Sequence, residues 1–375
     1  MEKFMKQKLL AIAVAGLSGT ALAQSTVTIT GLFDTGVQMF KTESAGVTTK
    51  TNRWGSSSNT GTTNLTFLVD EALGDNMKAG LFLETDPTAG TANAAASMWN
   101  SQNYLYLSGG FGKVSLGYMN NFANTAATTA QPFGTAMGGG YTSAFGRLNG
   151  VSVIGAPANV AVATAVTAGA FAGARDIRAN NSIKWDSPSF SGFTAGLIYR
   201  SPNSGSGNAA ADADGQTQVG LAYNNGPLNI AYAHSNILSN VASLNKGVTT
   251  HNLLGANYKF GTVTLYGGWT SSKSTGVNGA AAGLATSSVD ARSWNVALKW
   301  QATPSLAIAA NVLRSDDKLV ADQDRSLNAL GLDYAMSKRT TAYARWEGGD
   351  NDKSAVTGSA GGKFNRTAFG LKHSF

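Results

Sequence analysis

The sequence predicts an all-β transmembrane protein, an antiparallel β-barrel of about sixteen strands. Apolar and polar residues alternate with a period of two along the chain, which is typical of strands with one apolar face. Tight turns alternate with long polar segments, as in barrels that cross an outer membrane. After the N-terminus, no stretch reads as a spanning helix. The nearest, 151–174, is rich in alanine, glycine and threonine and contains Pro157, so we interpret it as a loop.

The N-terminus has the features of a secretory signal peptide. Three lysines among the first eight residues precede the apolar run "LLAIAVAGLSGTALA", which ends in small residues at Ala21 and Ala23. This is an A-x-A cleavage pattern, so residues 1–23 are expected to be removed and 24–375 to form one barrel domain. The alternative, an uncleaved membrane anchor, is disfavoured because the apolar run is short.

Composition excludes several classes of protein. Without residues 1–23 the chain keeps 25 basic and 20 acidic side chains, and no basic stripe suggests a nucleic-acid partner. There is no cysteine, which excludes disulfides and cysteine-ligated metals. Only 13% of residues are charged, although mean hydropathy is close to zero. Such a chain must be held together by backbone pairing and packing.

The strand pattern is clearest in four segments. In each, the residues of one parity are apolar and the intervening ones are largely polar or small. These apolar sets are Val27, Ile29, Phe33, Val37 and Met39; Met77, Ala79, Leu81 and Leu83; Phe193, Ala195, Leu197 and Tyr199; and Trp294, Val296, Leu298 and Trp300. Strict alternation over this length predicts strands rather than helices.

Seven tight turns and eight long connections imply the strand count. The turns lie at 70–76, 108–112, 186–192, 224–227, 259–261, 301–305 and 336–339, and each contains glycine, proline, asparagine or serine. The long segments are roughly 41–62, 85–100, 120–177, 201–216, 235–249, 271–291, 315–324 and 347–362. In outer-membrane barrels the short turns are periplasmic and the long loops extracellular.

A closed barrel solves the problem that a membrane sets for strands. Each unpaired backbone group in hydrocarbon costs several kcal/mol, so strands cross only when the sheet closes. A soluble sandwich or propeller would also alternate, but without the long-short rhythm of its connections. Aromatic residues near strand ends are expected to form interfacial girdles. They are Phe40, Trp185, Tyr199, Tyr223, Tyr258, Trp269, Trp300, Tyr334 and Trp346.

Several segments, spread over residues 28–375, resemble the general diffusion porins of Gram-negative bacteria, especially the sixteen-stranded trimeric group of β-proteobacteria. They include "TITGLFDTGV", "DEALGDNMKAGLFLE", "NNSIKWDSPSF", "GLDYAMSKRT" and the terminal "GLKHSF". The resemblance implies an outer-membrane homotrimer of water-filled pores, each narrowed by its third loop, for passive diffusion of ions and small hydrophilic solutes. Outer-membrane lipid, lipopolysaccharide and the barrel-assembly machinery are the partners it implies.

The third loop departs from the pattern of the family. Segment 120–177 is by far the longest connection. It contains "QPFG", with Gln131 and Phe133, and Gln131 stands at the position where the family has an acid. No acid occurs between Asp86 and Asp176, so the charges of the loop before Asp176 are Arg147 and Arg175. At three positions where the resemblance expects wall arginines, the chain has Asn64, Ser101 and Tyr118. One alternative is that Arg53 is a displaced copy of the first of these wall arginines.

Candidate pore-lining residues are charged side chains on the polar parity, residues of the third loop, and Tyr118, where the resemblance expects an arginine. They are Arg147, Arg175, Arg178, Lys184, Arg345, Lys372, Tyr118, Gln131 and Phe133, with Lys78 and Lys299 fitting the same pattern. A cation on the lipid side near the midplane would cost about 2–4 kcal/mol, which favours the inward orientation. The set suggests weak anion preference. The alternative is that each cation solvates a wide lumen or pairs with Asp34, Glu84 or Asp186.

Other functions have weaker support in the sequence. No catalytic, cofactor or metal site is predicted, because the three histidines lie far apart and no hydrolase motif is present. A substrate-selective porin remains the main alternative, and it would be expected to show a ladder of lumen aromatics, whereas Phe82 and Tyr266 look scattered. An adhesion protein would place its function in the outer loops, which contain no recognisable binding module. The terminal Phe375, at the end of "TAFGLKHSF", resembles the signal read by the assembly machinery.

Overall fold

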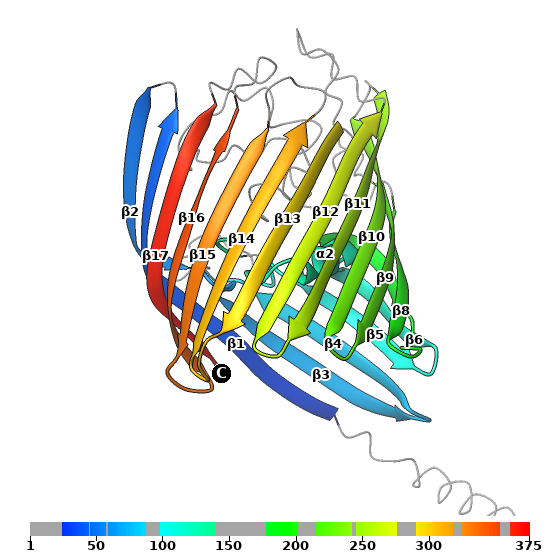
Figure 1. Ribbon diagram of the computed structural model, residues 1–375. Coiled ribbons are helices and arrows are strands. Elements are labelled where there is room, and N and C mark those ends of the chain that lie inside the picture. The colour runs from blue at the N-terminus through cyan, green and yellow to red at the C-terminus, as the bar shows by residue number, and fades with distance from the viewer. Residues whose placement is uncertain are drawn as a thin grey trace, which may run out of the picture.

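The computed structural model is one antiparallel sheet that closes into a barrel (Figure 1). From β3 onward each strand pairs with its neighbours in the chain, and β17 returns to pair with β1. The elements are β1 (Ser25–Ser44), β2 (Val47–Ser57), β3 (Asn64–Gly74), β4 (Met77–Thr85), β5 (Asn103–Gly109), β6 (Gly112–Asn120), α2 (Phe122–Thr129), β7 (Arg178–Asp186), β8 (Phe193–Arg200), β9 (Gly215–Asn225), β10 (Leu228–Val241), β11 (Asn245–Phe260), β12 (Val263–Thr275), β13 (Asp290–Gln301), β14 (Leu306–Asp317), β15 (Arg325–Ala335), β16 (Thr340–Asn351) and β17 (Gly362–Ser374).

The structure describes residues 25–44, 46–57, 59–87, 98–134, 136–139, 178–201, 215–241, 245–275, 290–317, 324–352 and 361–375. The predicted signal peptide, Arg147 and Arg175 lie outside these ranges. Among the described residues, no helix is both long and apolar enough to cross a membrane.

The seventeen strand segments form sixteen positions around the barrel, as predicted. The first part of β1 pairs with β3 from Ser25 to Leu32, and its second part pairs with β2 from Thr35 to Ser44. β2 and β3 therefore follow one another along a single position in the wall. Arg53 lies opposite Gln38, on the inner parity of β1, and its interpretation as a displaced wall arginine stays a prediction.

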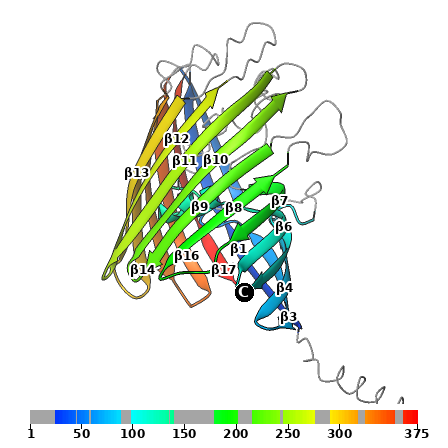
Figure 2. The same cartoon turned by 90° about the vertical axis from the view of Figure 1, so that its right-hand side faces the viewer.

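The barrel closes between the first and last strands. Leu32 to Glu43 of β1 pair with Ser374 back to Lys363 of β17. Beyond the last strand residue, the backbones of Gly31 and Phe375 exchange two hydrogen bonds, both of 3.1 Å. No edge of the sheet is left open at the seam, which is the condition for strands in hydrocarbon. Figure 2 shows the oblique course of the strands around the wall.

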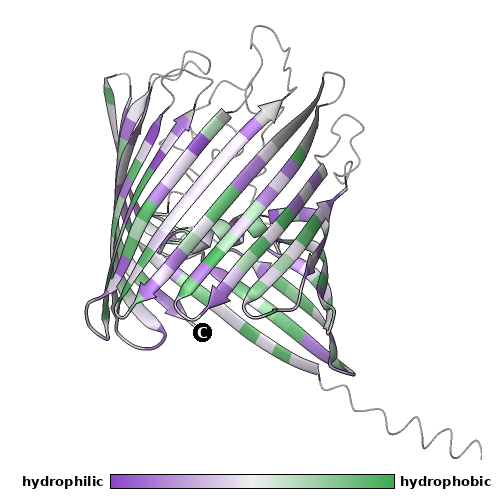
Figure 3. Ribbon diagram, turned by 45° about the vertical axis from the view of Figure 1, so that its right-hand side comes forward, coloured by the Kyte–Doolittle hydropathy of each residue, from purple (hydrophilic) through white to green (hydrophobic). Residues whose placement is uncertain are grey.

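The two faces of the wall follow the predicted parities. Green and purple segments alternate along the strands in Figure 3. On β13 the outward side chains Trp294, Val296, Leu298 and Trp300 are 40–60% exposed, whereas the intervening Ser293, Asn295 and Ala297 are buried inside. Phe193, Leu197 and Tyr199 on β8 and Val27, Ile29 and Phe33 on β1 are likewise exposed on the outer face. An apolar belt between aromatic residues surrounds the barrel.

Two expectations from the sequence are corrected here. Phe40 was assigned to the aromatic girdle, but it lies on the inner parity of β1 and packs against the apolar cluster inside the barrel. Much of the predicted loop 41–62 is strand, because β1 continues to Ser44 and β2 begins at Val47. Strands that rise above the lipid do not need an apolar face, so the alternation that marks them in the sequence fades there.

We predict that a charge on the outer face destabilises the barrel. Val296→Lys places an ammonium group between the two tryptophans of β13, so the free energy of unfolding should fall by about 2–4 kcal/mol. The measurement is urea unfolding in lipid vesicles. The control is Thr194→Lys, because Thr194 lies on the inner parity of β8. Equal losses in both variants would contradict the assignment of the faces.

Candidate pore constriction

The segment after β6 enters the barrel and carries the helix α2 (Figure 1). Asn121 caps the helix, and its side-chain oxygen accepts a hydrogen bond of 3.1 Å from the backbone of Asn124. The segment continues through the "QPFG" turn to Gly139, and residues 121–139 contain no charged side chain. This segment is called the inner loop below.

The inner loop lies on a track of small residues in the wall. Gly196 and Gly220 make room for the Phe122 ring, and Gly331 makes room for Phe133. A methyl group at Gly255 would overlap the carbonyl oxygen of Ala126 in the helix. Glycine lets the backbones of wall and loop approach closely, at the cost of side-chain packing within the strand.

Wall side chains fix the loop by hydrogen bonds to its backbone. The amides of Asn257, Asn295 and Asn311 donate to the carbonyl oxygens of Thr129, Ala130 and Gly138, at 3.0, 2.8 and 2.9 Å. The side-chain oxygen of Gln218 accepts from the backbone of Phe122 at 2.5 Å, and Glu347 accepts from Gly138 at 2.6 Å. Each bond contributes about 1 kcal/mol and satisfies a group that would otherwise be orphaned.

An apolar cluster completes the attachment. It joins three buried alanines of α2 and Phe133 to the inner faces of β10, β11, β14, β15 and β17. The wall members are Ala231, Ala233, Leu253, Ala309, Leu313, Leu327, Ala329 and Phe364. Farther along, Met137 packs against Tyr343 and Ala368. The loop thus covers the inner wall from β8 to β17, and the passage lies between it and the opposite wall.

The predicted arginines and lysines hold the loop and its surroundings. Arg345 is only 6% exposed, forms an ion pair of 2.7 Å with Asp333 and lies 5.5 Å from the Phe133 ring. Lys184 pairs with Asp186 at 3.2 Å and sits 4.5 Å from the Phe122 ring. Both cations therefore face inward, as predicted, but each has a carboxylate partner.

Arg178 bridges two strands that are not neighbours. It contacts Asp86, which follows β4, at 3.5 Å and Asn120 of β6 at 3.0 Å. Burial raises the pKa of the Asp86 carboxyl above its usual value, against the opposing effect of the Arg178 guanidinium. Lys372 lies on the inner parity of β17, with no ion pair among the described residues.

The remaining candidates have mixed positions. Gln131 is 2% exposed and donates to the carbonyl oxygen of Gly134 at 2.5 Å, so it shapes the loop turn. Phe133 is buried against the wall rather than exposed to the passage. Tyr118 lies opposite Asn103, on the parity of the outward Leu116, after a backbone irregularity at Gly117. We therefore leave Tyr118 out of the proposed constriction.

The wall facing the loop carries an aromatic strip and a hydrogen-bonded acid whose contacts the sequence interpretation did not foresee. The Phe82 and Tyr104 rings stack at 5.1 Å, and Tyr106 follows at 6.3 Å from Tyr104. Asp34 accepts hydrogen bonds from Tyr343, from Thr60 and from the backbone of Gly61. The aromatic strip had a signal, since Phe82 and Tyr104 share inner parity, but their register required the structure.

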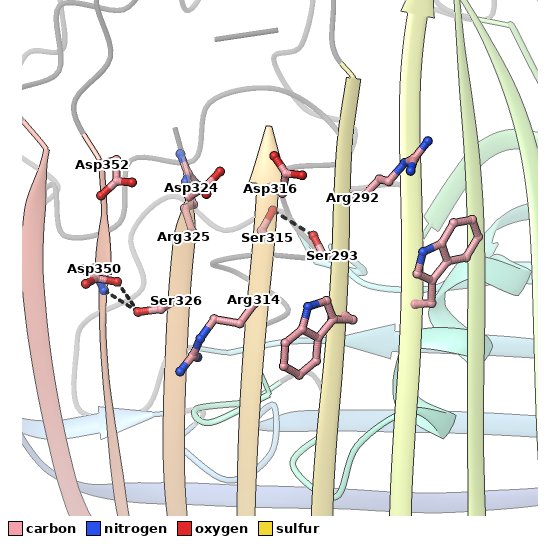
Figure 4. Close-up of a pocket in the computed structure, with 12 residues that line it drawn as sticks. Arg292, Ser293, Arg314, Ser315, Asp316, Asp324, Arg325, Ser326, Asp350 and Asp352 are labelled. Carbon is pink, nitrogen blue, oxygen red and sulfur yellow. Dashed lines mark hydrogen bonds between the residues drawn. The ribbon is translucent and has the colours of Figure 1, made fainter. Parts of the chain in front are cut away.

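A cavity of about 450 Å³ lies high on the outer face, across β12–β16 (Figure 4). Arg292, Arg314 and Asp316 line it from β13 and β14, beside the aromatic residues Trp269 and Trp294. On the left of the view, Ser326 donates a hydrogen bond to Asp350. This surface is charged directly above the apolar belt. Among the described residues, no group of three or more metal-ligating side chains is suited to holding a metal ion.

The closed sixteen-position barrel and its inner loop define a class, the water-filled channels of the bacterial outer membrane. The chain belongs to the Gram-negative porin family, whose model matches residues 10–354. It is thus an outer-membrane porin that forms a channel for passive diffusion. Its family and fold are those of a channel rather than those of an enzyme.

Individual proteins show the same likeness. Outer membrane porin protein 32 of Delftia acidovorans is 31% identical over 276 residues, which are 70% of this chain and 68% of that protein. The structure of an anion-selective porin from Comamonas acidovorans matches with a TM-score of 0.74 and 23% identity, over 94% of this chain and all of that one. OmpT of Vibrio cholerae in its trimer form matches with a TM-score of 0.62 and 13% identity, over 94% and 99%.

The glycine track predicts an effect on conductance. Gly255→Val should push α2 off the wall into the passage, lowering single-channel conductance and costing about 1–3 kcal/mol of stability from overpacking. The control is Gly267→Val, at a position with open space on the outer face. An unchanged conductance in Gly255→Val, with the control also unchanged, would contradict the packing of the inner loop.

Proposed function

We propose that this porin passes small hydrophilic solutes by size and weakly prefers anions. The observation that carries the proposal is an imbalance on the inner face. Its described carboxylates are all held by donors: Asp34 by Tyr343, Asp70 by Tyr106, Glu84 by Ser101, Asp86 by Arg178, Asp186 by Lys184, Asp333 by Arg345, and Glu347 by Arg366. Three of these donors are neutral hydroxyls, so Asp34, Asp70 and Glu84 keep their negative charge. The described inner cations still outnumber the seven carboxylates, because four are paired with them and five more lysines (Lys78, Lys113, Lys259, Lys299 and Lys372) are not, so the net field in the passage is positive.

The name of the Comamonas relative supports the same direction, because that protein is described as anion-selective. The neutral inner loop keeps the preference weak. A channel focuses the field of its lining charges because its walls have a low dielectric constant. Here the charges nearest the loop are paired, and a paired charge contributes little net field.

Reversal potential in a KCl gradient tests the proposal. We expect a modest shift toward the chloride equilibrium potential, larger at low salt because screening is weaker. Liposome swelling with neutral solutes of graded size should give rates that fall with size alone. A clear preference for potassium would contradict the anion assignment without affecting the identification of the chain as a porin.

A substrate-selective channel is the second candidate, and one observation favours it. The Phe82–Tyr104–Tyr106 strip lies on the inner wall, with the Lys113 ammonium 5.3 Å from the Tyr106 ring. Aromatic faces offer binding surface to the apolar faces of sugars. Swelling rates that saturate for sugars, but not for polyols of the same size, would favour this candidate over general diffusion.

The partners are further parts of the proposal. The trimer form recorded for OmpT supports a homotrimer. The cavity beside Trp269 and Trp294 is lined by three arginines and four aspartates. Lipopolysaccharide is the proposed neighbour of this surface, with Arg292 facing its phosphates and cations needed beside the aspartates. Cleavage of residues 1–23, export and insertion by the barrel-assembly machinery belong to the same route to the outer membrane.

The terminal aromatic residue gives a separate prediction. Removing Phe375 deletes two backbone hydrogen bonds to Gly31 and the proposed assembly signal, so the yield of folded protein in the outer membrane should fall several-fold. The conductance of the channels that do insert should stay near that of the wild type. The control is Phe375→Tyr, which keeps the ring and the backbone bonds. Normal membrane yield of the truncated chain would refute the role of Phe375.

A further inference from the structure

Four inner lysines form two matched sets at the end of the barrel with the short turns. Lys78 of β4 and Lys113 of β6 both lie directly opposite Ser108 of β5, one on each side. On another part of the wall, Lys259 of β11 and Lys299 of β13 both lie opposite Thr264 of β12. Each set is thus a row of lysine, hydroxyl and lysine across three neighbouring strands.

Both rows face the lumen at the periplasmic mouth. Gly268, on the parity of Thr264, touches Ala130 of the inner loop, and Asn257, on the parity of Lys259, donates to the loop. The Lys113 ammonium lies over the inner Tyr104 and Tyr106 rings. Each lysine lies within a few residues of a short turn at this end.

The rows stand nearly opposite one another. Counting β2 and β3 as one position, β5 and β12 are seven positions apart in the ring of sixteen. Within a row, neighbouring strands are about 4.8 Å apart, which separates the two lysine backbones by about 10 Å. The long side chains on both sides can therefore converge on an ion held at the hydroxyl.

The four lysines are available for a ligand. All are exposed or half-buried, and among the described residues none has a carboxylate within ion-pair distance. The inner acids of this end are engaged elsewhere, Asp70 by Tyr106, Asp186 by Lys184 and Asp333 by Arg345. Asp186 of β7 lies directly opposite Lys113, but its carboxylate pairs with Lys184, so neither row has a carboxylate at ion-pair distance from its own lysines among the described residues.

We propose that these two rows bind polyvalent oxyanions, of the phosphate and polycarboxylate class, at the periplasmic mouth. Two ammonium groups and one hydroxyl provide donors to several oxygens of such an anion, and charge-assisted hydrogen bonds are the strong ones. The proposal rests on the proposed function, since it assigns the source of the anion preference to the mouth and adds a ligand. It also makes the channel asymmetric, because the opposite end lacks a matching described row.

The test uses single channels in planar bilayers with inorganic tripolyphosphate as the probe. Added on the periplasmic side, it should reduce chloride current at about tenfold lower concentration than on the other side. Orientation is assigned by one-sided maleimide labelling of Ser337→Cys in the 336–339 turn, since the chain has no other cysteine.

The variant Lys78→Gln, Lys113→Gln, Lys259→Gln, Lys299→Gln should lose this sidedness and most of the anion preference. The matched control removes the same charge outside the lumen, with Lys41→Gln, Lys338→Gln, Arg339→Gln and Lys363→Gln, and should behave as the wild type. Unchanged block in the first variant, or equal loss in the control, would overturn the proposal. Wild-type channels without any anion preference would instead refute the proposed function, which the KCl gradient measures separately.

Discussion

The structure depends on one requirement, that every backbone donor and acceptor inside the membrane has a partner. The wall meets this requirement by closing, and the hydrogen bonds between Gly31 and Phe375 complete the ring. Because closure joins the first and last strands, the chain must complete all sixteen positions before any of them is stable in lipid. The one-sided alternation of the final strand follows from this, since its apolar side chains face hydrocarbon and Lys372 faces the lumen.

Closure also explains how the wall tolerates so much glycine. A glycine in a strand contributes no side-chain packing and weakens an isolated sheet. In the barrel, backbone bonds on both sides hold Gly220 and Gly255 in place, so these positions can yield space to the inner loop. Polar anchors such as Asn295 and Asn311 then replace the water that the loop backbone loses. The wall is thus selected for fit to the loop as well as for closure.

The sequence predicted the strand number from the alternation of tight turns with long connections, and the barrel and the inward cations from parity. Lys184, Arg345 and Lys372 were assigned correctly to the inner face for that reason. Tyr118 became a candidate because the resemblance places a wall arginine there, although it shares the parity of Leu116, which faces outward on β6. Partners were also beyond reach, since Arg345 meets Asp333 only through the pairing of β15 with β16. The alternation of residues along a strand predicts which face a side chain lies on. Its contacts with the next strand depend on the register between the two strands, which the alternation does not give.

The division of charge within the pore follows from how the loop is held. A loop without charged residues needs neutral amides and small wall residues beneath it, and the nearby charges Arg345, Arg366 and Glu347 are consumed in ion pairs that support it. A buried pair must stay matched, because removing one partner leaves an uncompensated charge. Among the described residues, the inner lysines without an ion pair stand where no loop needs support, at the periplasmic mouth. The inner loop narrows the passage, and the lysines at the mouth set the ion preference. These two properties are therefore carried by different residues at different depths of the same wall.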